Sequence, residues 1–182
     1  PCRCRPCLAE YTRSHTLPAA SEIWRLTGLV PYEEARVTAI LSGLLAEFAA
    51  RHPGVEIGVM DLDLESFVHR ALARALAKAH VPTTCYTERT YVSGPPTIPI
   101  ARARLDALGL KSAPLVCGLW LRRFSPGNVK SAARGIIQRS SGYYVFTSYS
   151  LWLDPGSLTG PYVLQGQRDD YWKAFREVNR TP

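Results

Sequence analysis

Residues 55–92 have the sequence VEIGVMDLDLESFVHRALARALAKAHVPTTCYTERTYV, in which two apolar runs flank an amphipathic segment. The first run, 55–62, is typical of a short buried strand, and 65–80 has the apolar spacing of a helix. Pro82 breaks that helix, and residues 83–92 have the β-branched and aromatic content of a second strand. Strand, helix and strand in this order predict a βα unit of a parallel sheet.

The same alternation continues to the end of the chain. Apolar residues spaced by three and four predict a helix that ends near His52, before the first strand. Four βα units after this helix predict an α/β fold, and right-handed crossovers would place the strands side by side with the helices outside. The remaining expected elements are helices at about 98–108, from SPGN (125–128) through about Arg139 and over roughly 168–179, and strands at 114–121 and 142–151.

Four βα units fill half of a (β/α)8 barrel. The chain begins with Pro1, and Met60 is its only methionine, which predicts that it is the carboxyl-terminal part of a longer protein. We therefore expect a single partial domain, the C-terminal half of a TIM barrel, with a cysteine knuckle and loop at 1–31 and the βα units at 32–182. The competing architecture is an open, doubly wound parallel sheet of the flavodoxin type.

The composition is that of an ordinary globular domain, with 182 residues, 46% of them hydrophobic and 20% charged. No apolar run reaches the roughly 18 residues that a membrane helix needs, so no membrane partner is expected. The net charge of +7 comes from residues at helical spacing, such as Arg70, Arg74 and Lys78, without an interleaved aromatic stripe. We therefore expect solvated helix faces and no nucleic-acid partner. A zinc-knuckle nucleic-acid binder is a third hypothesis, which predicts a strongly salt-dependent affinity for DNA or RNA.

The sequence CRCRPC near the amino end brings Cys2, Cys4 and Cys7 together in a Cys-x-Cys-x-x-Cys cluster. Three thiolates this close make most of a tetrahedral zinc site. Because structural zinc sites are usually closed by four protein ligands, we expect a structural zinc whose fourth ligand lies upstream. The other two cysteines, Cys85 and Cys117, lie in apolar runs, where a free cysteine acts as a small buried hydrophobe. An odd total of five argues against a disulfide framework and favours reduced thiols, with a cytoplasmic location.

Reactive groups of parallel α/β folds gather at the carboxyl ends of the strands. Asp61 ends the first expected strand, and Glu88 lies toward the end of the second, on a neighbouring strand roughly 5 Å away. Two carboxylates in one cleft can have their pKa values pushed apart, as glycoside hydrolysis requires. Asp61 and Glu88 are therefore the candidate catalytic residues. The alternatives are that Asp61 caps the following helix and that Glu88 pairs with a neighbouring Arg.

Aromatic residues crowd the last two expected strands and their ends: Trp120, Tyr143, Tyr144, Phe146, Tyr149 and Trp152. Aromatic rings pack on the C–H faces of sugars, whereas sugar hydroxyls need Arg, Asp or Glu nearby. This mixture predicts a carbohydrate partner, with Trp120, Tyr149, Trp152 and Arg122 as candidate substrate-binding residues. The alternative is core packing, which we expect for Phe146.

The run CRCRPCLAEY at 2–11 resembles the cysteine knuckle of barrel glycosidases related to the beta-galactosidases of glycoside hydrolase family 42. This resemblance implies that the knuckle follows the fourth barrel strand and that Cys2, Cys4 and Cys7 bind zinc with an upstream cysteine. Three later runs resemble the seventh strand, the eighth strand and the final helix of uncharacterised bacterial glycosidase-like barrels: GLWLRRFSPGNV (118–129), SSGYYVFTSYSLW (140–152) and YWKAFREVN (171–179).

The resemblance does not supply a catalytic residue. In that family the acid/base glutamate precedes the knuckle, and the nucleophile is a glutamate that ends the seventh strand. The corresponding run here, PLVCGLWLRRF (114–124), contains no carboxylate. We expect a glycoside hydrolase acting on an O-glycosidic bond, in which Glu88 or Asp61 works with an upstream carboxylate. The alternative is a non-catalytic barrel that binds a carbohydrate or a partner. The sequence indicates no oligomeric state.

Overall fold

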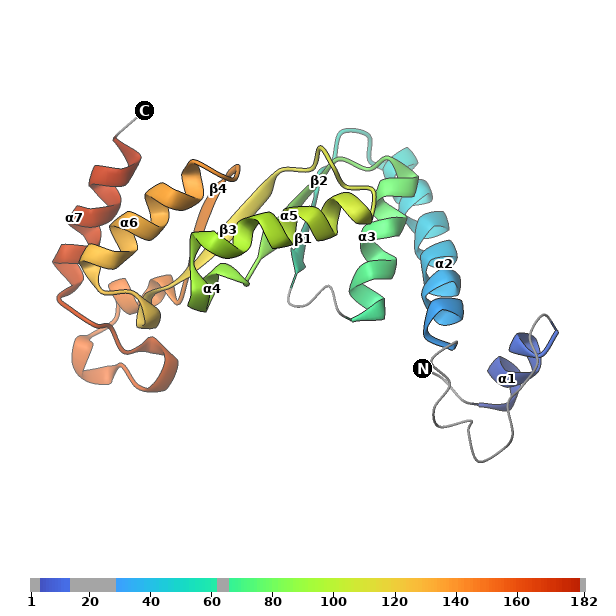
Figure 1. The fold of residues 1–182 in the computed structure, drawn as a ribbon, viewed down its shortest axis with the longest axis horizontal. Coiled ribbons are helices and arrows are strands. Elements are labelled where there is room, and N and C mark those ends of the chain that lie inside the picture. Colours follow the sequence, from blue (N-terminus) through green and yellow to red (C-terminus); the bar gives the residue numbers. More distant parts are fainter. Residues whose placement is uncertain (1–3, 14–28, 62–65, 181–182) are drawn as a thin grey trace. The chain divides into compact units, whose positions relative to one another are not determined.

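The computed structural model describes residues 4–13, 29–61 and 66–180. The chain divides into two compact units. The first, the helical unit, contains α1 (Arg5–Tyr11), α2 (Leu29–Arg51) and α3 (Phe67–Ala79). The second, the sheet unit, contains strands β1 (Ile57–Asp61), β2 (Thr83–Thr87), β3 (Leu115–Trp120) and β4 (Gly142–Phe146), and helices α4 (Thr90–Ser93), α5 (Ile98–Ala107), α6 (Pro126–Ile137) and α7 (Arg168–Asn179) (Figure 1).

The four strands form one sheet in the order β1-β2-β3-β4, and every neighbouring pair is parallel. Tyr86 of β2 aligns with Met60 of β1 and with Val116 of β3, and Gly118 of β3 aligns with Tyr144 of β4. The strands therefore follow one another in space as they do in the sequence. This arrangement confirms the predicted parallel α/β sheet.

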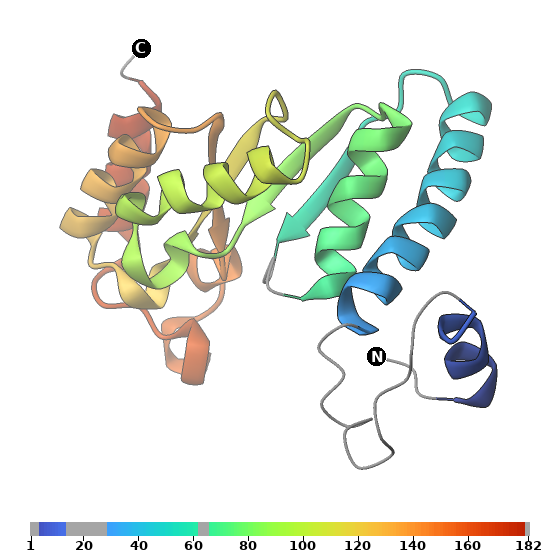
Figure 2. The same cartoon turned by 45° about the vertical axis from the view of Figure 1, so that its right-hand side comes forward.

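One face of the sheet is covered by helices of the same unit. Figures 1 and 2 both show α5 and α6 along one side of the sheet. Phe175 of α7 stacks on Tyr143 of β4, with 5.9 Å between the ring centroids. Cys85 and Cys117 are buried in the strands, as predicted for small apolar cysteines. Burial raises the pKa of the Cys117 thiol, which keeps it protonated.

The residues that alternate with the buried ones lie on a more open face. Tyr86 and Val116 are half-buried there, Met60 is 46% exposed and Phe146 is 39% exposed. We expected strands that are buried on both faces, as parallel sheets usually are. The structure differs because α7 packs against Tyr143 on the covered face. The more open face carries aromatic side chains such as Phe146.

In the helical unit, α2 and α3 are joined by a partly buried carboxylate. Glu34 of α2, 12% exposed, accepts hydrogen bonds from Arg70 Nε at 2.8 Å and from Arg74 Nε at 3.0 Å. Ile40 and Leu44, two of the apolar residues whose spacing predicted α2, are each 59% exposed. The apolar spacing of α2 predicted the helix correctly, but the side of α2 that packs on α3 carries Glu34, whose partners Arg70 and Arg74 belong to α3.

Two expected strands are shorter in the structure. β2 ends at Thr87, because the backbone N–H of Tyr91 donates to the Glu88 carbonyl and begins the α4 turn. β4 ends at Phe146, because Thr147 has a φ of 59° and leaves the extended conformation. The sequence signals for helices were more reliable: α5, α6 and α7 lie at or within two residues of their expected bounds.

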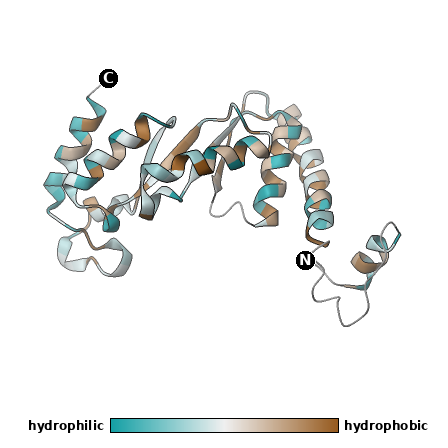
Figure 3. Cartoon of the chain, in the orientation of Figure 1, coloured by the Kyte–Doolittle hydropathy of each residue, from teal (hydrophilic) through white to brown (hydrophobic). Residues whose placement is uncertain are grey.

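The start of α6 shows why the sequence signals for helices were reliable. Ser125 is its N-cap and accepts a hydrogen bond from the backbone N–H of Asn128, and Pro126 is the first helical residue. Hydrophilic and hydrophobic residues alternate along α7, as its amphipathic sequence requires (Figure 3).

Among residues 4–13, 29–61 and 66–180, no helix is both long and apolar enough to cross a membrane.

Candidate functional site

The candidate site is a cluster of tyrosines around Glu88, just beyond the carboxyl end of β2. Tyr91 of α4 donates a hydrogen bond to Glu88 Oε1 at 3.3 Å. Its hydroxyl oxygen also lies 2.9 Å from the hydroxyl oxygen of Tyr144 on β4. The Tyr86 ring of β2 meets the Tyr144 ring edge to face at 5.9 Å. Three elements thus place three phenol rings and one carboxylate together.

Gly118 of β3 makes room for this cluster. A Cβ atom at this position would lie 2.0 Å from Tyr91 Cε1 and 2.8 Å from Tyr144 Cζ. Thr90, also on α4, holds the backbone of Gly118, because its buried hydroxyl donates to the Gly118 carbonyl at 2.7 Å. Because Gly118 has no side chain, the Tyr91 and Tyr144 rings can lie directly against β3.

The two phenol hydroxyls of the cluster take part in three contacts. Tyr91 donates to Glu88, Tyr144 donates to the Thr87 carbonyl at 3.4 Å, and the two hydroxyl oxygens face each other with either as the donor. Burial raises the pKa of Tyr91, and the hydrogen bond with Tyr144 and the charge of Glu88 raise it further. Tyr91 therefore stays protonated at neutral pH and remains a donor to the carboxylate.

An aromatic row extends from Tyr91 across the sheet. The Tyr91 ring stacks on Phe146 with 4.9 Å between centroids, and Phe146 meets Trp120 edge to face at 6.1 Å. Arg122 and Arg123 place their guanidinium carbons 6.0 and 5.3 Å from the Trp120 ring centroid. The row thus begins at a carboxylate and ends at two cations.

The structure brings Glu88, Trp120 and Arg122 into this connected set. Tyr149 reaches it indirectly: its ring lies 4.9 Å from Tyr162, and the neighbouring Pro161 carbonyl accepts a hydrogen bond from Trp120 Nε1 at 3.0 Å. Trp152 lies elsewhere: its ring packs on Trp172 of α7 at 4.8 Å, and it is 69% exposed.

Asp61 is the last residue of β1 and aligns with Thr87 in the register of the sheet. Glu88 lies one residue beyond that register position. Asp61 thus ends β1, whereas Glu88 follows the last residue of the neighbouring strand β2, one register position farther along.

The predicted zinc knuckle is described only in part. Cys2 lies outside the described residues. Cys4 precedes α1 and is exposed, and Cys7 lies within α1. Within the described ranges, no three His, Cys, Asp or Glu side chains are grouped so that they could hold a metal ion.

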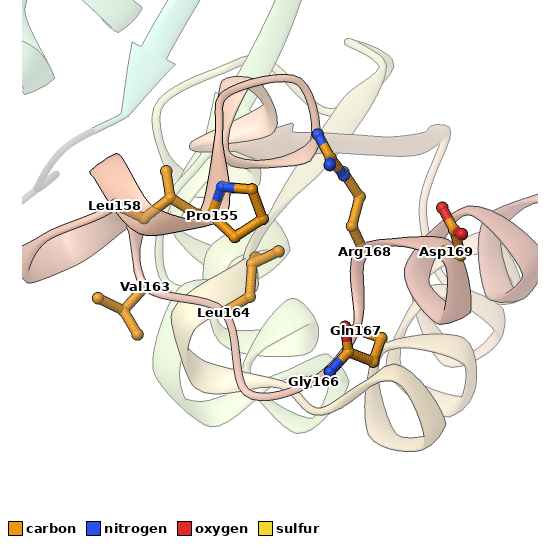
Figure 4. Close-up of a pocket in the computed structure, with 8 residues that line it drawn as sticks. All are labelled: Pro155, Leu158, Val163, Leu164, Gly166, Gln167, Arg168 and Asp169. Atoms are coloured by element: carbon orange, nitrogen blue, oxygen red, sulfur yellow. The ribbon is translucent and has the colours of Figure 1, made fainter.

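Two hollows of the sheet unit lie away from Glu88. One has a volume of about 280 Å³ in the loop before α7: Pro155, Leu158, Val163 and Leu164 form one side, and Gln167, Arg168 and Asp169 lie on the other (Figure 4). The other, about 510 Å³, is lined by Tyr143 and Val145 of β4 with Trp172 and Phe175 of α7, among others. Glu88 lines neither hollow.

Comparison with known proteins gives no relative from which a role could be transferred: no protein-family model, no curated protein and no solved structure matches this chain.

Sequence reasoning missed Tyr91 and Arg123. Tyr91 was assigned to the end of a strand, although the polar run TERT (87–90) before it signals that the strand ends there. Arg123 follows Arg122 in the sequence, and only the structure shows that both guanidinium groups lie over Trp120.

Proposed function

We propose that this chain supplies part of the active site of a glycoside hydrolase with a (β/α)8 barrel, and that Glu88 is its reacting carboxylate. The observation that carries the proposal is the hydrogen bond from Tyr91 to Glu88 at the start of an aromatic row. A carboxylate held by a protonated donor is fixed in position, and aromatic rings beside it suit the C–H faces of a sugar.

The strand order supports the barrel. Sequential strands β1 to β4, all parallel, are the arrangement of consecutive barrel strands. A doubly wound sheet reverses its strand order at a switch point, and no reversal occurs among these four strands. The half-open aromatic face would then be the inner face of the barrel, and the carboxyl ends of the strands would surround the substrate.

A second candidate is non-catalytic binding of a carbohydrate or a partner. Hydrolysis requires two carboxylates in defined positions. Asp61 aligns with Thr87 and not with Glu88. This offset favours non-catalytic binding unless another carboxylate reaches the site. In the first candidate, the second carboxylate is Asp61 or comes from an upstream segment. A structural zinc held by Cys2, Cys4 and Cys7 remains part of both proposals.

The test compares Glu88→Gln with Glu56→Gln. Glu56 is an exposed carboxylate just before β1, at the opposite end of the same sheet, where it accepts a hydrogen bond from Thr84. Hydrolysis of a panel of aryl glycosides and calorimetric binding of neutral and acidic oligosaccharides would be measured on the full chain. We expect Glu88→Gln to lower hydrolysis about a hundredfold or more and Glu56→Gln to leave it unchanged.

The possible outcomes separate the two candidates. Sugar binding that depends on Glu88, without hydrolysis of any glycoside, would replace the first candidate by the second. Binding of no oligosaccharide at all, by a protein that remains folded, would overturn the first candidate and the carbohydrate-binding form of the second.

A further inference from the structure

Two arginines, Arg122 and Arg123, lie at the far end of the aromatic row. Arg122 and Arg123 are exposed, and their guanidinium groups lie over Trp120. Within the part of the chain that the structure describes, no carboxylate forms an ion pair with either of them. A guanidinium group that lies over an aromatic ring still presents its N–H donors at its edge, where a carboxylate can bind with two hydrogen bonds.

The turn that carries these arginines is held firmly. Residues Leu121–Arg123 form a 3-10 turn directly after β3. The Phe124 carbonyl accepts a hydrogen bond from the Tyr171 hydroxyl at 2.6 Å, and the Arg122 carbonyl accepts one from Gln165 Nε2 at 2.6 Å. Tyr171 belongs to α7 and is fully buried.

Trp120 is held in the same way. Its indole N–H donates to the Pro161 carbonyl, so that the ring beneath the two arginines is fixed by the loop before α7. The backbone of the turn and the ring are therefore ordered before any ligand arrives, while both cationic groups remain open to solvent. Such preordering reduces the entropy lost on binding.

We propose that the carbohydrate bound at this site is acidic, and that Arg122 and Arg123 bind the carboxylate of a uronic acid residue. This inference rests on the proposed function and names its substrate class. Phe146 and Trp120 would carry the sugar rings between the two ends of the row. The acidic residue lies at the end away from Glu88, so the carboxylate of the ligand is separated from the carboxylate of the protein by the Tyr91, Phe146 and Trp120 rings.

The experiment uses pairs of ligands that differ only in charge. Oligomers of galacturonate, glucuronate and mannuronate are compared with their carboxyl-reduced, neutral counterparts by titration calorimetry on the full chain. The variant is Arg122→Ala/Arg123→Ala, which removes two exposed side chains and leaves the backbone contacts of Tyr171 and Gln165 in place. Circular dichroism verifies that it folds.

The matched control is Arg139→Ala. Arg139 is exposed and lies between α6 and β4, where the chain enters the amino end of its strand. The Arg139→Ala variant removes positive charge from the same unit. It therefore reports the general attraction of a chain with net charge +7 for any anion.

We expect at least one acidic oligomer to bind about tenfold or more tightly than its neutral counterpart, and the double variant to abolish this preference, as expected when charge-assisted hydrogen bonds are lost. The Arg139→Ala protein keeps the preference. Equal binding of acidic and neutral oligomers would overturn the inference and leave the proposed function intact. A preference that survives in the double variant would also overturn it. Binding of single-stranded DNA or RNA that depends on both arginines, without sugar binding, would overturn this inference and the proposed function together.

Discussion

Gly118 is the position at which one added methyl group tests the architecture of the site. In Gly118→Ala, the new Cβ would lie 2.0 Å from Tyr91 Cε1, 2.7 Å from Tyr91 Cδ1 and 2.8 Å from Tyr144 Cζ. The sheet cannot yield at this residue, because the Gly118 carbonyl is bound by the buried Thr90 hydroxyl and its strand is paired on both sides. The tyrosine rings must therefore move, and the contact of Tyr91 with Glu88 is lost.

Overpacking of this kind destabilises a protein by about 1–3 kcal/mol. Replacement of glycine by alanine also restricts the unfolded chain, which offsets about 0.4–1 kcal/mol of that loss. We therefore expect a net decrease of about 0–2.6 kcal/mol in the free energy of unfolding of the sheet unit. Urea denaturation followed by tryptophan fluorescence measures it, because Trp120, Trp152 and Trp172 all belong to this unit.

The control is Gly127→Ala in α6, where no atom lies within 4 Å of the added Cβ. Helix propensity predicts a change of no more than about 1 kcal/mol there, in the stabilising direction. A double-mutant cycle with Tyr91→Ala identifies the source of the effect, because removal of the ring removes most of the collision. If Gly118→Ala is as stable as the parent and the cycle shows no coupling, the packing of Tyr91 against β3 described above is wrong.

Two further predictions concern the ion pairs of the helical unit and the buried tyrosines. Glu34→Gln should destabilise the pairing of α2 and α3 by about 1–3 kcal/mol, because Glu34 accepts from Arg70 and Arg74 and is 12% exposed. Glu47→Gln, which removes an exposed pair with Arg51, should change stability by less than about 0.5 kcal/mol in the same thermal unfolding followed by circular dichroism, and equal effects would contradict the assignment. Burial raises the pKa of Tyr91, Tyr143 and Tyr171 in the folded chain, so their contribution to stability is complete below about pH 10 and is lost as the pH rises above that value. Tyr91→Phe should make the alkaline fall in stability shallower, whereas Tyr149→Phe, at an exposed phenol, should alter it less; an identical slope in the parent and in Tyr91→Phe would contradict the burial of Tyr91.

The sequence determined the secondary structure and the parallel sheet, because both depend on local periodicity. The apolar runs, the helix-breaking Pro82 and the helix-start signal SPGN (125–128) were sufficient to predict four strands in the correct order. Strand ends were less predictable, because the aromatic residues after Thr87 and Phe146 favour strands by composition. In the structure, the backbone turn from Glu88 to Tyr91 and the positive φ of Thr147 end the two strands.

The site was only partly visible in the sequence. Glu88, Trp120 and Arg122 could be proposed from their residue types at strand ends. The tertiary structure alone decided that Tyr91 binds Glu88, that Gly118 makes space for the rings, and that Trp152 packs on α7. The physical reason is distance along the chain: Tyr91 and Tyr144 are 53 residues apart, and only the register of three parallel strands brings their hydroxyl groups to 2.9 Å.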